Sequence, residues 1–132
     1  MFLSLLNEKE QKNFLELAVI AMNVDGKTDE KEQHVIEVYR RETNLNGYEI
    51  KNKSEKELIS LFQASTKKVR RAVIIELAGV LDADEVIEGS EESWILKLGL
   101  DLGFRAVEVR RMIRWTQDFN DLLNEGYDII LK

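Results

Sequence analysis

The stretch LAVIAMNVDGKTDEKE, residues 17–32, joins a strongly apolar run to an apolar-periodic one through an Asp-Gly turn rich in charge. A matching stretch, LAGVLDADEVIEGSE, follows at residues 77–91 and repeats the order of apolar helix, acidic turn and second helix. Duplicated helical hairpins have this kind of internal similarity, and they often pack about a pseudo-twofold axis. The repeat therefore predicts an all-α fold built from two similar hairpins, whose acidic turns face each other.

The rest of the chain has the same helical character. Apolar residues recur three and four positions apart, sustained two-residue alternation is missing, and the sequence contains no proline. A chain of 132 residues is long enough for one domain around a single core. We therefore expect residues 1–132 to form one compact, single-domain bundle of about six to seven helices.

Capping residues indicate where the helices begin. Asn7 followed by Glu10 predicts a capping box, Ser54 followed by Glu57 predicts a second, and Thr28 and Thr66 are further N-cap candidates. The loop NLNGYEIKNK, residues 44–53, separates the second helix from the third. We expect helices at about residues 7–23, 89–100 and 105–124, one that starts at Thr28 and ends before this loop, a short one that starts at Ser54, and one that starts at Thr66.

The last helix is expected to pack along its whole length. Its apolar stripe consists of Val109, Met112, Trp115, Phe119 and either Leu122 or Leu123. Gly126 is expected to end this helix, because glycine is favoured just after a helix C-terminus. The tail YDIILK, residues 127–132, would then pack back on the bundle, and Trp94 and Trp115 would be core residues.

Composition restricts the classes of function. The net charge of −6 disfavours nucleic acid as a partner and favours cations or basic partners. Without cysteine there is no disulfide or zinc–thiolate site, and a reducing cytoplasm is the simplest compartment. The opening MFLSLL lacks a basic leader, and the longest apolar run, residues 72–81, is about half the length of a membrane span. We expect no transmembrane segment.

The segments AMNVDGKTDEKEQHVIE, residues 21–37, and LDADEVIEGSEESWILKLGLDLGF, residues 81–104, resemble the two halves of a TerB-like domain of the tellurite-resistance group. The resemblance implies a compact helical domain whose acidic turns bind divalent metal, with a role in tellurite, metal-ion or stress response. Carried over by position, it implicates Asp25 and Glu32 in the first copy and Asp84 and Glu91 in the second. Glu85 stands where the family pattern has glycine, which puts the tightness of the second turn in doubt.

The acidic turns have two interpretations. Calcium, magnesium and manganese prefer several convergent carboxylate and carbonyl oxygens, which two facing turns would supply. Asp and Glu are also favoured around the first turn of any helix, where they complement its positive end. A cation site and simple capping therefore both remain open.

Other metal sites and enzymatic motifs fit less well. An EF-hand read from Asp82 has Ile87 at the position that requires glycine, and a di-iron bundle needs Glu-x-x-His pairs, which the single His34 does not form. We expect His34 to be a surface or boundary residue. The sequence has no justified catalytic triad, phosphate-binding loop, dinucleotide motif or H-E-x-x-H motif, so we expect no enzyme.

Two basic stretches complete the candidate surfaces, TKKVRR at residues 66–71 and FRAVEVRRMIRW at residues 104–115. The arginines Arg105, Arg110, Arg111 and Arg114 either form a stripe for an acidic partner or membrane phosphates, or pair with the surplus acids in solvent. Two hypotheses follow. The chain is a cytoplasmic, non-enzymatic module that binds calcium, magnesium or manganese at Asp25, Glu32, Asp84 and Glu91, or it is a metal-free domain whose acidic turns or arginine stripe bind another protein, soluble or membrane-associated. A third hypothesis is a hydrolase that uses the carboxylates. It needs a substrate-sized cleft beside them, and none can be inferred from the sequence.

Overall fold

The computed structural model describes residues 1–24, 30–82, 87 and 89–132, without the side chains of residues 30–33. Throughout these ranges the regular structure is helical, which confirms the predicted all-α bundle. The first element is a short 3₁₀ helix, η1, and six α-helices follow it in the described chain. Their bounds are η1 Leu3–Leu5, α1 Glu8–Met22, α2 Glu30–Thr43, α3 Glu55–Gln63, α4 Lys67–Leu81, α5 Gly89–Asp101 and α6 Ala106–Leu131.

The predicted caps begin three of these helices. The Asn7 side chain accepts the Glu10 N–H at 2.8 Å while the Glu10 carboxylate accepts the Asn7 N–H at 2.9 Å, a complete capping box. Ser54 caps α3 and Thr66 caps α4 through their hydroxyl oxygens. Thr28, the expected cap of α2, lies outside the described residues.

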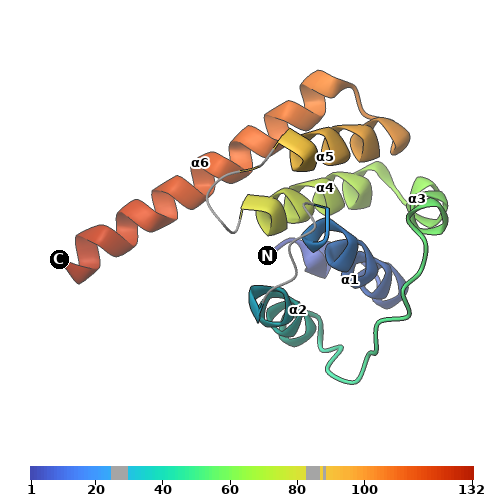
Figure 1. Cartoon of the computed structure of the whole chain (residues 1–132), viewed down its shortest axis with the longest axis horizontal. Helices are drawn as coiled ribbons and strands as arrows, with labels where there is room; N and C mark the ends of the chain where they lie inside the picture. The colour runs from blue at the N-terminus through green and yellow to red at the C-terminus, as the bar shows by residue number, and fades with distance from the viewer. Residues whose placement is uncertain (25–29, 83–86, 88) are drawn as a thin grey trace.

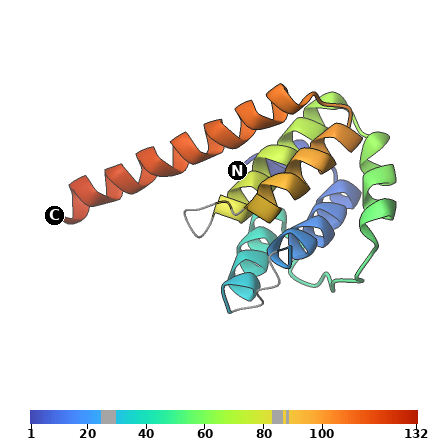
Figure 2. The ribbon, with the colours of Figure 1, turned by 45° about the horizontal axis from the view of Figure 1, so that its top comes forward.

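Helix α4 lies at the centre of the bundle. It contacts α1 on one side and α5 and α6 on the other, while α2 and α3 pack against α1 (Figure 1). The hairpins α1–α2 and α4–α5 correspond to the two copies of the repeat. The first turns of α1 and α4 lie together, because the Ser65 hydroxyl donates to Glu10 at 2.6 Å, and the two helices run in the same general direction (Figures 1 and 2).

The core follows the predicted helical stripes. On α4 one whole apolar stripe is buried, and Phe14, Leu17 and Ala18 of α1 face it. Burial of large aliphatic and aromatic side chains contributes about 1.5–3 kcal/mol each, so this seam supplies much of the stability. The buried stripe of α4 consists of Val69, Ala72, Val73, Leu77 and Val80.

Two glycines shape the connection between α5 and α6. Gly103 has a φ of +92°, a left-handed conformation that glycine adopts without steric cost, and it lies just after the end of α5. Gly99 allows close helix packing, because a Cβ at this position would lie 2.3 Å from Cγ2 of Val109. The α5–α6 contact therefore depends on the absence of a side chain at residue 99.

The end of α6 departs from the prediction. The helix continues through Gly126 to Leu131, and its second half extends beyond the other helices instead of folding back (Figures 1 and 2). Gly126 tolerates helical dihedrals, and no proline follows to stop the helix, so a residue typical of helix ends lies inside one. Trp115 is 44% exposed and is not a core residue. The expected inner stripe is buried only at Val109.

Candidate functional site

The four predicted metal ligands are only partly described. Asp25 and Asp84 lie outside the described residues, and the side chain of Glu32 lies outside them as well. Glu91 is buried in the first turn of α5. Glu32 and Glu91 each stand two residues after the first residue of their helices, which agrees with the sequence repeat.

The two helices that lead into the acidic turns, α1 and α4, run in the same direction. Helices α1 and α4 start side by side, and each contains fifteen residues.

Asp82, the C-cap residue of α4, is buried and accepts a hydrogen bond from the Asn120 amide of α6 at 2.7 Å. In the described part of the chain no three His, Asp or Glu side chains gather as a metal site would require. His34 is exposed, as expected.

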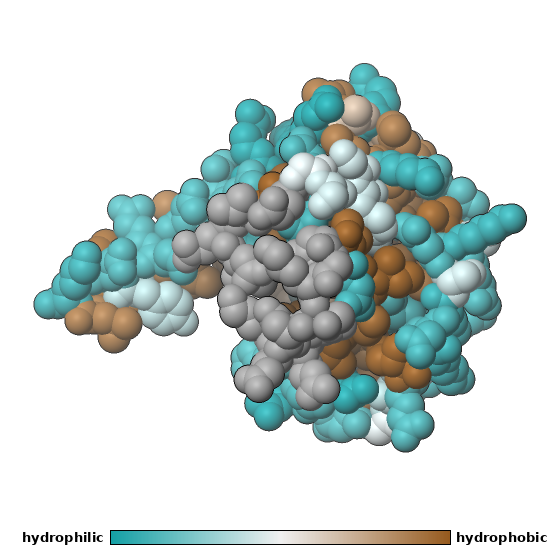
Figure 3. Space-filling view, viewed as in Figure 1, coloured by the Kyte–Doolittle hydropathy of each residue, from teal (hydrophilic) through white to brown (hydrophobic). Residues whose placement is uncertain are grey.

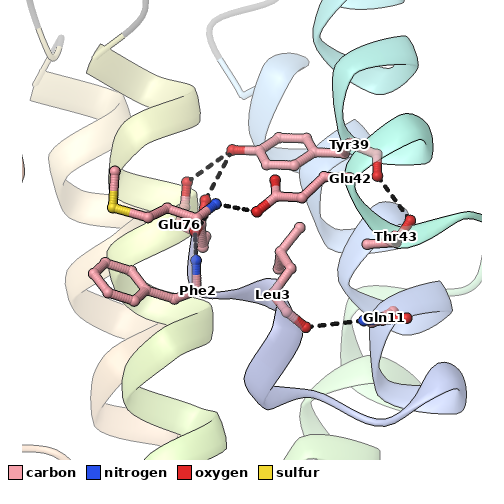
Figure 4. Close-up of polar contacts among 8 residues, drawn as sticks. Phe2, Leu3, Gln11, Tyr39, Glu42, Thr43 and Glu76 are labelled. Atoms are coloured by element: carbon pink, nitrogen blue, oxygen red, sulfur yellow. Dashed lines mark hydrogen bonds and ion pairs between the residues drawn. The ribbon is translucent and has the colours of Figure 1, made fainter.

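A buried carboxylate on α4 organises the N-terminal segment (Figure 4). Glu76 accepts the Phe2 N–H at 2.7 Å and forms an ion pair with the Met1 ammonium at 3.1 Å; this ammonium also contacts Glu42. The Tyr39 hydroxyl donates to Glu76 at 3.3 Å. Burial raises the pKa of Tyr39, and the negative charge of Glu76 raises it further. These partners satisfy Glu76, so the cluster fixes the N-terminal segment on α2 and α4.

A second buried carboxylate, Glu16 of α1, binds the loop between α2 and α3. It accepts the Tyr48 hydroxyl at 2.7 Å and the backbone N–H groups of Lys51 at 2.8 Å and Lys53 at 3.0 Å. The Lys53 ammonium donates to the buried Asn13 at 2.8 Å. Sequence analysis missed this role, although a single Glu within the apolar run FLELAVIA is a recognisable signal.

The outer side of this loop has a hollow of about 540 Å³. Acidic and basic side chains alternate around it, and Glu8 pairs with Lys12 at 3.3 Å. The opposite charges compensate one another, so the hollow offers no strong preference for a charged ligand. Its charged lining residues are Glu8, Lys12, Glu49 and Lys51.

A groove of about 370 Å³ between α4 and α6 has a different character. Its floor is apolar and aromatic, and two exposed arginines, Arg71 and Arg111, stand at its rim. The rings of Phe2 and Trp115 lie 5.9 Å apart between centroids, and Trp115 stacks on Phe119 at 5.5 Å. The lining residues are Phe2, Arg71, Ile75, Phe104, Glu108, Arg111, Met112 and Trp115.

The aromatic floor continues into an exposed apolar stripe on α6. Trp115, Phe119, Leu122, Gly126 and Ile129 follow one another at spacings of three and four, which places them on one helix face. We call these five residues the α6 stripe. Figure 3 shows apolar residues among polar ones on the projecting end of the helix. The large apolar side chains there are 48–79% exposed, namely Leu122, Leu123, Tyr127, Ile129, Ile130 and Leu131.

Each helix in the described ranges is too short or too polar to cross a bilayer. Comparisons with protein-family models, with curated proteins and with solved structures found no match. The resemblance to TerB-like domains therefore rests on the quoted residues and stays a prediction. The groove and the α6 stripe are the features of the described surface that most resemble a binding site.

Proposed function

We propose that this chain is a non-catalytic helical interaction module, which binds a protein partner through the α6 stripe and the groove beside it. The main observation in support is the second half of α6, which extends from the bundle with six large apolar side chains exposed to solvent. A contiguous exposed apolar surface of this kind marks interaction sites on soluble proteins. When the apolar face of an amphipathic helix is not covered by its own domain, the simplest explanation is a partner that covers it.

The charges around this surface favour a protein over a membrane. From its midpoint onward helix α6 carries Asp118, Asp121, Glu125 and Asp128, and these acids are repelled by anionic lipid surfaces. The arginine-rich face expected from the sequence contributes Arg111 to the rim of the groove, where Arg71 joins it. The proposed partner therefore presents an apolar surface with acidic groups for the groove and basic groups for the end of α6.

Photo-crosslinking tests this proposal. A photoreactive amino acid replaces Leu122, and the protein is irradiated inside the cells that naturally make it. The matched position is Asn124, which lies about 200° around the helix from Leu122 and about 3 Å further along it. We expect a discrete protein adduct from position 122 and a much weaker one from position 124. Equal labelling from both positions, or no adduct, would overturn the proposal.

A second candidate is the divalent-cation module that the TerB-like resemblance implies, with Asp25, Glu32, Asp84 and Glu91 as ligands. The parallel course of α1 and α4 favours it, because both helices approach their acidic turns from the same direction. Four carboxylates in one place would repel one another unless a cation neutralised them. Cation binding and partner binding use different residues, so the two candidates are compatible.

A further inference from the structure

We infer that the partner of α6 is a second copy of this chain, with the two α6 helices antiparallel about a twofold axis. The inference rests on the proposed function, since it identifies the occupant of the same surface. Its main support is the order of charges along α6. The first half carries Arg110, Arg111 and Arg114 against Glu108 and Asp118. The second half carries three acids, Asp121, Glu125 and Asp128, and the first base that follows them is Lys132, directly after the helix.

This order is unfavourable in an isolated helix. The peptide dipoles make the C-terminal end of a helix negative, so bases are stabilising there and acids are not. The last turn of α6 has no basic residue, and Glu125 and Asp128 lie close to it. A partner that brings positive charge to this end removes the conflict. The first half of the same helix in another copy has the required arginines.

Antiparallel pairing places these opposite halves together, whereas parallel pairing would place acids against acids. Arg111 and Glu125 are fourteen residues apart, close to four helical turns, so they lie on the same flank of the α6 stripe. In an antiparallel pair equivalent flanks face each other, and Arg111 of each copy then lies near Glu125 of the other. The twofold axis makes every such contact twice.

The groove provides a place for the second half of the partner's helix. The α6 stripe runs from the exposed end of the helix into the groove floor through Phe119 and Trp115, without an intervening polar residue on that face. An α6 helix of 26 residues is about 39 Å long, enough for each half to lie along the other copy. Leu122 and Ile129 would then enter the groove, and Arg71 and Arg111 at its rim would meet Glu125.

The experiment measures molar mass by sedimentation over about 1–200 µM of the full chain, a range in which mass action reveals reversible dimers. We expect the mass to rise towards that of two copies. Leu122→Lys should raise the dissociation constant by more than about tenfold, because it places a charge in the apolar seam. Asn124→Lys makes the same charge change on the opposite face and should alter the dissociation constant by less than about twofold. Both sites are exposed, so the monomer should keep its fold, which circular dichroism checks.

Charge reversal tests the antiparallel register. Arg111→Glu and Glu125→Arg should each weaken the dimer by about tenfold, and the double variant should regain affinity to within about threefold of the original. If the double variant loses as much dimerisation free energy as the two single variants together, the antiparallel pairing is overturned. A chain that stays monomeric at every concentration would overturn the inference altogether. If position 122 then crosslinks only to a different protein, the proposed function stands alone; if it crosslinks to nothing, both fail.

Discussion

The Glu16 carboxylate accepts the Tyr48 hydroxyl at 2.7 Å and joins the middle of α1 to the loop that follows α2. Glu16 is only 2% exposed, and two loop N–H groups share its oxygens. The loop is therefore held by a buried charge whose hydrogen bonds are satisfied by the chain itself.

Replacement of this carboxylate should be costly. Glu16→Ala leaves the donors of Tyr48, Lys51 and Lys53 without their acceptor, and we expect a loss of about 2–3 kcal/mol in the free energy of unfolding. Tyr48→Phe removes one of the three bonds and should cost about 1 kcal/mol. Urea unfolding at neutral pH measures both. Equal costs for the two variants would show that the backbone donors contribute nothing.

The contact between Gly99 and Val109 predicts a specific clash. Gly99→Ala should lower the free energy of unfolding by about 1–3 kcal/mol, because the new Cβ would overlap the Val109 side chain. Gly89→Ala in the same helix has open space around its Cβ and serves as the control, with a neutral or slightly favourable effect.

Thermal melting compares these variants, and a second substitution tests the cause. Val109→Ala removes the overlapping methyl groups, so Gly99→Ala should cost less in that background than in the original protein. Strictly additive effects would rule out the clash as the cause.

Tyr39 predicts a loss of stability in alkaline solution. Burial and the neighbouring Glu76 charge raise its pKa above that of an unfolded tyrosine, which is about 10. Its contribution is therefore complete below pH 10 and decreases as the pH rises from there, by up to about 1.4 kcal/mol per pH unit. The urea midpoint of Tyr39→Phe should fall less steeply between pH 9.5 and 11 than that of the original protein. Parallel curves would contradict this.

The cation candidate predicts a rise in melting temperature with calcium, magnesium or manganese. At about a hundred times the dissociation constant, binding to the folded state adds about 2.7 kcal/mol. Asp25→Asn with Asp84→Asn should abolish the rise. Asp118→Asn with Asp121→Asn makes the same change of charge on α6 and should preserve it. Melting curves that no cation shifts would remove the candidate.

The helix starts and inner stripes were predictable because they depend on local patterns. Asn7 and Glu10 predicted the start of α1, and the apolar residues of α4 that recur at three and four positions are buried. The repeat also predicted the two hairpins, α1–α2 and α4–α5. These features follow from capping chemistry and from the 3.6-residue period, which the sequence displays directly.

The end of α6 was not predictable in the same way. An apolar stripe shows which face of a helix avoids water, but it does not show whether the same chain covers that face. Trp115 lies to the side of the buried face, since its neighbour Thr116 is buried against α4, and Leu122 is 67% exposed on the second half of the helix. Gly126 was a misleading stop signal, since its preference for helix ends is statistical. The groove also combines Phe2, Ile75 and Phe104, which are far apart in the sequence.

The reversed charge order of α6 has a consequence for how the molecule opens. In the monomer its last turns have acids at the negative end of the helix, and no other helix in the described part of the chain packs on them, so their amide hydrogens should exchange with solvent first. Proteases should likewise cut there before they reach the α1–α4 seam. Limited proteolysis would then leave a bundle that lacks the end of α6 and still unfolds cooperatively.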